Sequence, residues 1–131
     1  MKKLILLVVI TLFFVSCGNQ NKWVRYELCM GLSIDSGKNV ISETQWQQFL
    51  EKEIVTRFPN GFTIFDAKGY WHDQTSIYTE PSKIFMVVAL KNNETRNKIR
   101  SIANSYIETF NQDAVLQITT DAEIEFHQNA N

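Results

Sequence analysis

The residues best suited to chemistry gather near the middle of the chain. Trp71-His72 and Glu80-Pro81-Ser82-Lys83 flank a polar, turn-like segment, so a hairpin would bring His72 close to Glu80. A carboxylate beside an imidazole raises the pKa of the imidazole and orients one tautomer, which suits acid–base catalysis. The alternative is a solvated His–Glu pair, which contributes little to stability. We favour this second, structural interpretation.

Two cations near this stretch could bind an anionic group. Lys83 follows Pro81 at the start of an apolar run, and Arg57 precedes Phe58-Pro59 at the expected end of a helix. A cation at a helix C-terminus also stabilises the helix dipole, and we favour that structural role for Arg57. The complete set of candidate ligand-binding residues is Arg57, Trp71, His72, Glu80 and Lys83.

Several other kinds of site lack their usual residue pattern. The sequence has no His-x-x-x-His or Cys-x-x-Cys spacing, so we expect no metal site. It has neither a Gly-x-Ser-x-Gly nucleophile motif nor a glycine-rich phosphate loop, and we expect no cofactor. No basic run occurs, so nucleic acid is not an expected partner. Cys29 has no nearby His in the sequence, and we expect it to be buried and inert.

The N-terminal residues are typical of an export signal. Lys2 and Lys3 precede an apolar run from Leu4 to Val15, which is too short for a bilayer-spanning helix of about 20 residues. This order predicts a signal peptide over residues 1–16. Phe14-Val15-Ser16-Cys17 resembles the bacterial lipobox, so we expect lipid on Cys17. An ordinary signal peptide is the alternative.

The expected lipid determines where the protein would work. Residues 17–22 would form a short polar tether, and the lipid on Cys17 would hold the protein to a membrane of the cell envelope, on the periplasmic or extracellular side. After Cys17 the chain has 11 of its 13 basic residues and all 14 acidic ones, which leaves a weakly acidic domain. Its length suits one compact domain, expected over residues 23–127, with a polar tail at 128–131.

The remaining sequence alternates between strand and helix patterns. Apolar residues recur with period two at 23–34 and 114–126, and a continuous apolar run covers 84–90. Aromatic and branched residues mark another strand at 62–71, ahead of the interrupting Pro81. Helical spacing follows a capping box at Ser42 and a second cap at Asn92-Asn93.

The expected fold is α+β. The order β-α-β-β-α-β predicts a ferredoxin-like two-layer sandwich, in which two helices cover one face of a four-stranded antiparallel sheet. The first and third strands would be central. The other face would lack helices and would display Arg25, Glu27, Cys29, Phe65 or Trp71, and Gln117. Such a face serves as solvent surface, dimer interface or ligand floor.

Several short motifs resemble those of a known family. The chain contains, in this order, Gly31-Leu32-Ser33, Trp46, Arg57-Phe58-Pro59-Asn60-Gly61-Phe62-Thr63, Gly69-Tyr70-Trp71 and Glu80-Pro81-Ser82-Lys83. The set resembles a bacterial family of uncharacterised proteins and lipoproteins, the domain of unknown function 3574. The resemblance extends from Tyr26 to Phe126 and implies no particular activity.

Two functions therefore stay open. The first is a non-enzymatic binding or interaction module, held at the membrane, that binds a protein or small molecule through its helix-free face, forms a homodimer and displays an apolar patch on that face. The second is a small-molecule-binding protein or enzyme with a site at the hairpin between 62–71 and 84–90, where His72 and Glu80 would meet. The missing catalytic motifs favour the first.

Overall fold

A computed structural model describes residues 22–72 and 74–129. The expected signal peptide (1–16), Cys17 and most of the tether lie outside these residues, as does the end of the tail. The elements are β1 (Trp23–Gly31), β2 (Ser33–Ile34), β3 (Asn39–Val40), α1 (Glu43–Phe49), the π-helical segment η1 (Leu50–Val55), β4 (Thr63–His72), β5 (Ile77–Leu90), α2 (Asn93–Phe110) and β6 (Leu116–Ala122). No helix among the described residues is long and apolar enough to cross a membrane.

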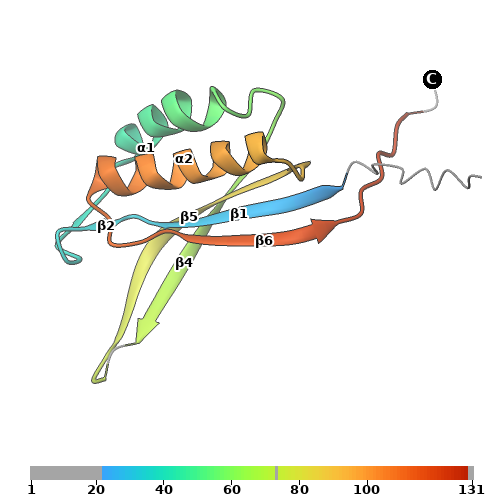
Figure 1. Ribbon diagram of the computed structural model, residues 1–131. Helices are drawn as coiled ribbons and strands as arrows, with labels where there is room; N and C mark the ends of the chain where they lie inside the picture. Colours follow the sequence, from blue (N-terminus) through green and yellow to red (C-terminus); the bar gives the residue numbers. More distant parts are fainter. Residues whose placement is uncertain (1–21, 73, 130–131) are drawn as a thin grey trace, which may run out of the picture.

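The domain is a mixed α/β structure with a four-stranded antiparallel sheet. The strand order is β4-β5-β1-β6, so β1 and β5 are central, and both helices lie on one face of the sheet (Figure 1). The described residues form six strands and not the expected four, because β2 and β3 form a separate two-stranded ribbon. This ribbon forms where the expected strand 23–34 bends: the Leu32 N–H donates to Pro81 O, and Leu32 O accepts from Ile41 N.

The helix layer follows local sequence signals. Ser42 and Gln45 form the expected capping box, with hydrogen bonds in both directions between the two residues. After about two turns α1 widens into η1, a change that the helical spacing did not predict. Asn92 caps α2 through the Thr95 N–H at 2.7 Å, and Asn111 ends the helix in a left-handed conformation with φ of 50°.

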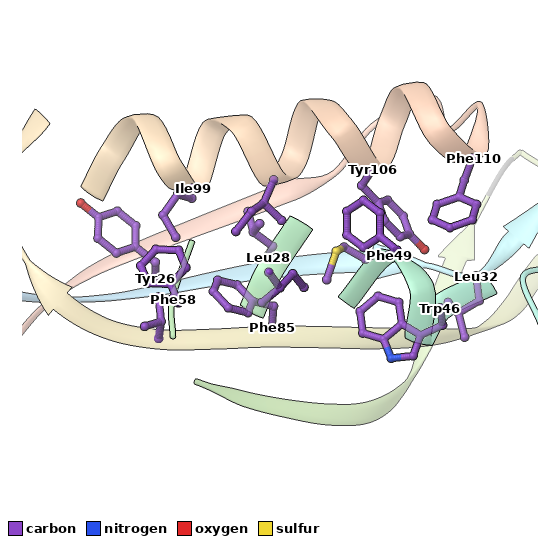
Figure 2. Packing of buried hydrophobic residues seen from close by; sticks show 14 of the residues in the cluster. Tyr26, Leu28, Leu32, Trp46, Phe49, Phe58, Phe85, Ile99, Tyr106 and Phe110 are labelled. Carbon is purple, nitrogen blue, oxygen red and sulfur yellow. The ribbon is translucent and has the colours of Figure 1, made fainter. Parts of the chain in front are cut away.

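The core lies between the helices and one face of the sheet. The β1 side chains that face the helices alternate with half-buried or exposed ones, as the period of two predicts. Aromatic rings from α1 and α2 pack against one another, with 5.2 Å between the ring centroids of Phe49 and Tyr106 (Figure 2). The most deeply buried large side chains are Trp46, Tyr106, Phe85, Leu28, Met30, Ile54, Ile99, Ile102 and Val24.

Strand β5 is longer than the sequence indicated. It runs from Ile77 to Leu90 straight through Pro81, where we expected an interruption. Proline is tolerated because the Pro81 carbonyl accepts the Leu32 N–H on the side where β1 has already ended. In an antiparallel strand the nitrogen of a residue faces the same side as its carbonyl, so no bond to β4 is lost.

The far halves of β4 and β5 project beyond the rest of the sheet. Pairing between β1 and β5 ends at Gly31 and Ser82, whereas β4 and β5 stay paired to His72 and Ile77. Residues 68–72 and 77–81 therefore form a two-stranded arm that extends away from the helices (Figure 1). An isolated two-stranded hairpin is only marginally stable in water, so the arm needs a brace at its base.

The orientation of β6 corrects one expectation. Gln117 pairs with the buried Leu28, and directly paired residues share a face, so Gln117 lies on the helix side and not on the helix-free side. Leu116 and Ile118 lie on the helix-free face instead. The strand ends at Ala122, earlier than the expected Phe126, whose side chain is exposed. The alternation of apolar residues predicted the strand, but it did not show which face of the strand points to the core.

Candidate functional site

The carboxylate of Glu80 accepts hydrogen bonds from two other strands. Its Oε1 atom accepts the indole N–H of Trp71 on β4 at 2.5 Å. Its Oε2 atom accepts the backbone N–H of Ser33 on β2 at 3.3 Å. An ionised acceptor strengthens such bonds. Glu80 thereby ties the base of the arm to the end of β1 and the start of the ribbon.

Two glycines make room for this carboxylate. A Cβ atom at Gly31 would lie 2.6 Å from Glu80 Oε2, which is closer than real contacts allow. A Cβ atom at Gly69 would lie 3.3 Å from Glu80 Cγ and 3.1 Å from Ser82 Oγ. Glycine within a strand often marks such a close approach. We call Glu80, Trp71, Ser33, Gly31 and Gly69 the Glu80 clamp.

The Glu80 carboxylate forms no ion pair with a cation of the described residues. None of the ion pairs formed within residues 22–72 and 74–129 includes it. Burial raises the pKa of the Tyr106 phenol, and the negative charge of the nearby Glu80 raises this pKa further. Tyr106 donates its hydroxyl hydrogen to Gly31 O at 2.7 Å, which fixes the floor of the clamp to α2.

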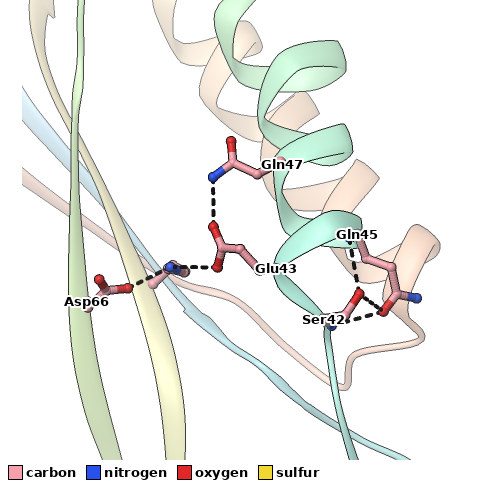
Figure 3. A network of polar contacts seen from close by, with 6 residues as sticks. Ser42, Glu43, Gln45, Gln47 and Asp66 are labelled. Carbon is pink, nitrogen blue, oxygen red and sulfur yellow. Dashed lines mark hydrogen bonds and ion pairs between the residues drawn. The ribbon is translucent and has the colours of Figure 1, made fainter.

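Lys83 lies on the opposite, helix-covered face. Its Nζ atom is 2.6 Å from Asp66 Oδ1 and 3.5 Å from Glu43 Oε2, in a network that Figure 3 shows between α1 and the sheet. The ammonium also lies 5.7 Å from the centre of the Trp46 ring. The hydrogen bond that Lys83 donates to Asp66 raises the pKa of Lys83. With two carboxylates beside it, Lys83 joins the helix layer to the sheet and is separated from Glu80.

Arg57 is likewise held within the helix layer. Its Nη1 atom donates to Glu53 O at 2.7 Å, and its Nη2 atom donates to Ser101 Oγ at 3.0 Å. The Glu53 carboxylate lies 2.8 Å from Nη1 as an ion pair without hydrogen-bond alignment. These contacts tie the end of η1 to α2, as expected for a structural arginine.

His72 and Glu80 are not brought together. Register places His72 opposite Ile77 and Glu80 opposite Gly69, so the two side chains lie on opposite faces of the arm. The acid–base pair therefore has no geometric basis. Of the five candidate residues, the structure joins only Trp71 and Glu80.

The helix-free side of the sheet carries a continuous apolar row. Phe65 pairs with Ile84, Ile84 pairs with Cys29, and Cys29 pairs with Leu116, so one row crosses all four strands. Phe65 and Leu116 are 45% and 59% exposed. Cys29 is half-buried, not fully buried as expected, and partial burial and then Glu27 raise the pKa of its thiol. We call this side, with Val88 and Ile118, the open face.

The clamp brings together three of the family-like motifs, although the sequence did not predict that they lie close to one another. Gly31-Leu32-Ser33 and Gly69-Tyr70-Trp71 supply two members each and Glu80-Pro81-Ser82-Lys83 supplies one, from four strands in all. Gly31, Gly69 and Ser33 were not candidate site residues. The two glycines could have indicated the clamp, because an isolated glycine within a strand pattern suggests a close approach. Within residues 22–72 and 74–129 no three His, Cys, Asp or Glu side chains are grouped so that they could hold a metal ion.

Comparisons with known proteins define the fold and the family. A phage SAM lyase in complex with S-methyl-5'-thioadenosine is 15% identical with a TM-score of 0.59, over 77% of this chain and 81% of that one. The apo state of a phage SAM lyase gives the same identity and score over 77% and 82%. CutA from Synechococcus elongatus PCC7942 is 7% identical with a TM-score of 0.48, over 78% of each chain. At 15% identity, the similarity to the two phage SAM lyase structures shows a shared mixed α/β fold alone.

The family follows from the sequence. Residues 25–126 match the model of a family described as a protein of unknown function, DUF3574. The chain therefore belongs to this family, which confirms the resemblance over nearly the same residues. No curated protein matches it.

Proposed function

We propose that this protein is a non-enzymatic interaction module of the cell envelope whose open face binds a second copy of the chain. The observation that carries the proposal is the apolar row Phe65–Ile84–Cys29–Leu116. Ile118 and Val88, 39% and 37% exposed, extend it toward the start of β1. Contiguous exposed apolar surface of this kind is typical of an interface.

The size of the open face sets the expected affinity. Four strands about 4.8 Å apart and nine residues long give a face of about 600 Å² in projection. A stable interface buries about 800 Å² per partner, so the face approaches but does not exceed the usual size. We therefore infer a dimer with a dissociation constant in the micromolar range.

A second copy also fits the charges on this face. Arg25 and Glu27 lie there side by side as an ion pair. A twofold dimer brings the same patch of both copies together, so each copy offers a cation and an anion to its partner. A face with one sign of charge would repel its own copy, and this one does not.

Sedimentation or light scattering on the chain starting at Asn19 tests the dimer. We expect mass to rise with concentration through the micromolar range, and Ile118→Lys to leave a monomer. Val55→Lys is the matched control, since Val55 is 40% exposed but lies on η1 in the helix layer. A monomer at every concentration, or equal effects of both lysines, contradicts the proposal.

The tether is the second part of the proposal. The lipobox-like Phe14-Val15-Ser16-Cys17 supports lipid on Cys17 and attachment to an envelope membrane. Labelled palmitate fed to cells that make the full-length chain tests it. We expect label in the membrane fraction, its loss in Cys17→Ala and its retention in Cys29→Ala. Unlabelled full-length protein in the cytosol contradicts the tether.

The fold proposal is finer than the α/β class. We infer a ferredoxin-like sandwich to which the β2–β3 ribbon and the arm have been added. The central position of β1 and β5 supports this assignment. An experimental structure of the Asn19 chain with another strand order would contradict it.

A further inference from the structure

The Glu80 clamp has the features of a binding site and lies beyond the apolar row, on the same helix-free side of the sheet. Glu80 is half-buried at the base of the arm, and no cation among the described residues pairs with it. Burial of a carboxylate is unfavourable unless its charge is matched. A cation from outside the described chain would match it.

The hydrogen bonds of Glu80 specify what this cation must supply. A carboxylate has about four acceptor positions, and the Trp71 indole and the Ser33 backbone occupy one on each oxygen. Each oxygen keeps a free acceptor position. A ligand with N–H donors fills these positions, whereas a quaternary ammonium or a sulfonium has no such donor.

Two aromatic rings stand beside the carboxylate. Trp71 pairs with Tyr78 across the arm, on the same face as Glu80, and the two side chains are 62% and 55% exposed. Such rings attract cations through their faces. A cation–π contact of this kind is present on the other face of the arm, where Lys68 Nζ lies 5.5 Å from the centre of the Tyr70 ring.

We propose that Glu80, Trp71 and Tyr78 bind an organic cation with N–H donors, an ammonium or a guanidinium group. The carboxylate supplies the counter-charge and acceptors, and the aromatic pair supplies the side walls. Ser33 and the two glycines hold the carboxylate in place and do not touch the ligand. The site lies on the same side of the sheet as the apolar row but includes none of the residues of that row, and the proposal does not depend on the dimer.

Titration of the ¹⁵N-labelled chain from Asn19 with agmatine tests the site by NMR. The chain has three tryptophans, and the Trp71→Phe variant assigns the Trp71 indole signal. We expect this signal to shift with a dissociation constant of about 1 mM, and Glu80→Gln to weaken binding at least about tenfold. N-butylurea has N–H donors but no charge, and we expect no binding. Tyr70→Ala, on the other face of the arm, is the control variant and keeps binding.

The outcomes separate this proposal from the dimer. Binding to Ile118→Lys as to the parent chain supports a site that does not depend on the dimer. A short arginine peptide that binds more tightly than agmatine identifies a protein segment as the source of the cation; equal binding identifies a free small molecule. Choline binding more tightly than agmatine, agmatine binding unchanged in Glu80→Gln, or no shift up to about 50 mM agmatine overturns the proposal.

Discussion

Replacing Gly31 by alanine isolates the contribution of the Glu80 clamp to stability. The new Cβ would lie 2.6 Å from Glu80 Oε2, the far end of a flexible side chain, so the carboxylate moves and the backbone does not. Glu80 then loses the hydrogen bonds from Trp71 and from the Ser33 N–H. The substitution acts on the clamp without removing any of its polar groups.

The expected magnitude follows from these bonds. Bonds to a charged group contribute about 1.5–3 kcal/mol each when shielded, and because Trp71 is 62% exposed, we expect about 1–2 kcal/mol for both together. Alanine restricts the unfolded chain and returns about 0.5 kcal/mol. Gly31→Ala should therefore lower the free energy of unfolding by about 1 kcal/mol.

A double-mutant cycle with Glu80→Ala makes the test sharp. Without the carboxylate the new methyl group meets no obstacle, so Gly31→Ala should become stabilising by about 0.5 kcal/mol. The change of sign corresponds to a coupling energy of about 1–2 kcal/mol. Urea unfolding of the four proteins, followed by circular dichroism, measures it.

One result would refute the reasoning behind the clamp. If Gly31→Ala destabilises the protein equally with and without the Glu80 carboxylate, the glycine is required by the backbone and not by Glu80. Gly37→Ala is a useful contrast, because its positive φ of 82° makes alanine strained while nothing lies within 4 Å of the new Cβ. The loss of stability in Gly37→Ala should be the same with and without the Glu80 carboxylate.

Two further predictions concern ionisable groups at the core. Tyr106 keeps its proton in the folded state above the ordinary tyrosine value of about 10, so unfolding releases protons there and stability falls with rising pH, by up to about 1.4 kcal/mol per pH unit. Tyr106→Phe should cost about 1 kcal/mol at neutral pH and flatten this alkaline slope in urea titrations; an unchanged slope would contradict it. Lys83→Met should change stability by less than about 1 kcal/mol, because both carboxylate partners of Lys83 are mostly exposed and the methionine still covers Trp46. Lys83→Ala should lower stability clearly more than Lys83→Met. Equal losses in the two variants would show that the charge of Lys83, and not its packing on Trp46, is what stabilises the protein.

Features set by nearby residues could be predicted from the sequence. Ser42 and Gln45 lie three positions apart, so their capping box depends on one turn of helix alone. The period of two in β1 and the cap at Asn92 are local in the same sense. Each of these signals predicted an element that the structure contains.

Features set by distant residues could not be predicted. The phase of β6 depends on its pairing with β1, about ninety positions earlier, so alternation alone could not place Gln117. Pro81 is accommodated only because β1 ends beside it. The Glu80 clamp joins β1, β2, β4 and β5, and no sequence pattern indicates the space that Gly31 leaves free for the carboxylate. The pairing of Lys83 with Asp66 is non-local for the same reason.

The length of β1 separates the two ends of the molecule. Lys22 leads into its first residue, whereas the arm begins beyond its last, and nine residues at about 3.4 Å give about 30 Å between them. The five paired positions of the arm add up to about 17 Å. A chain anchored ahead of Lys22 would therefore carry Trp71 and Tyr78 at the end of the molecule that is farthest along β1 from the anchor, where they are open to dissolved molecules.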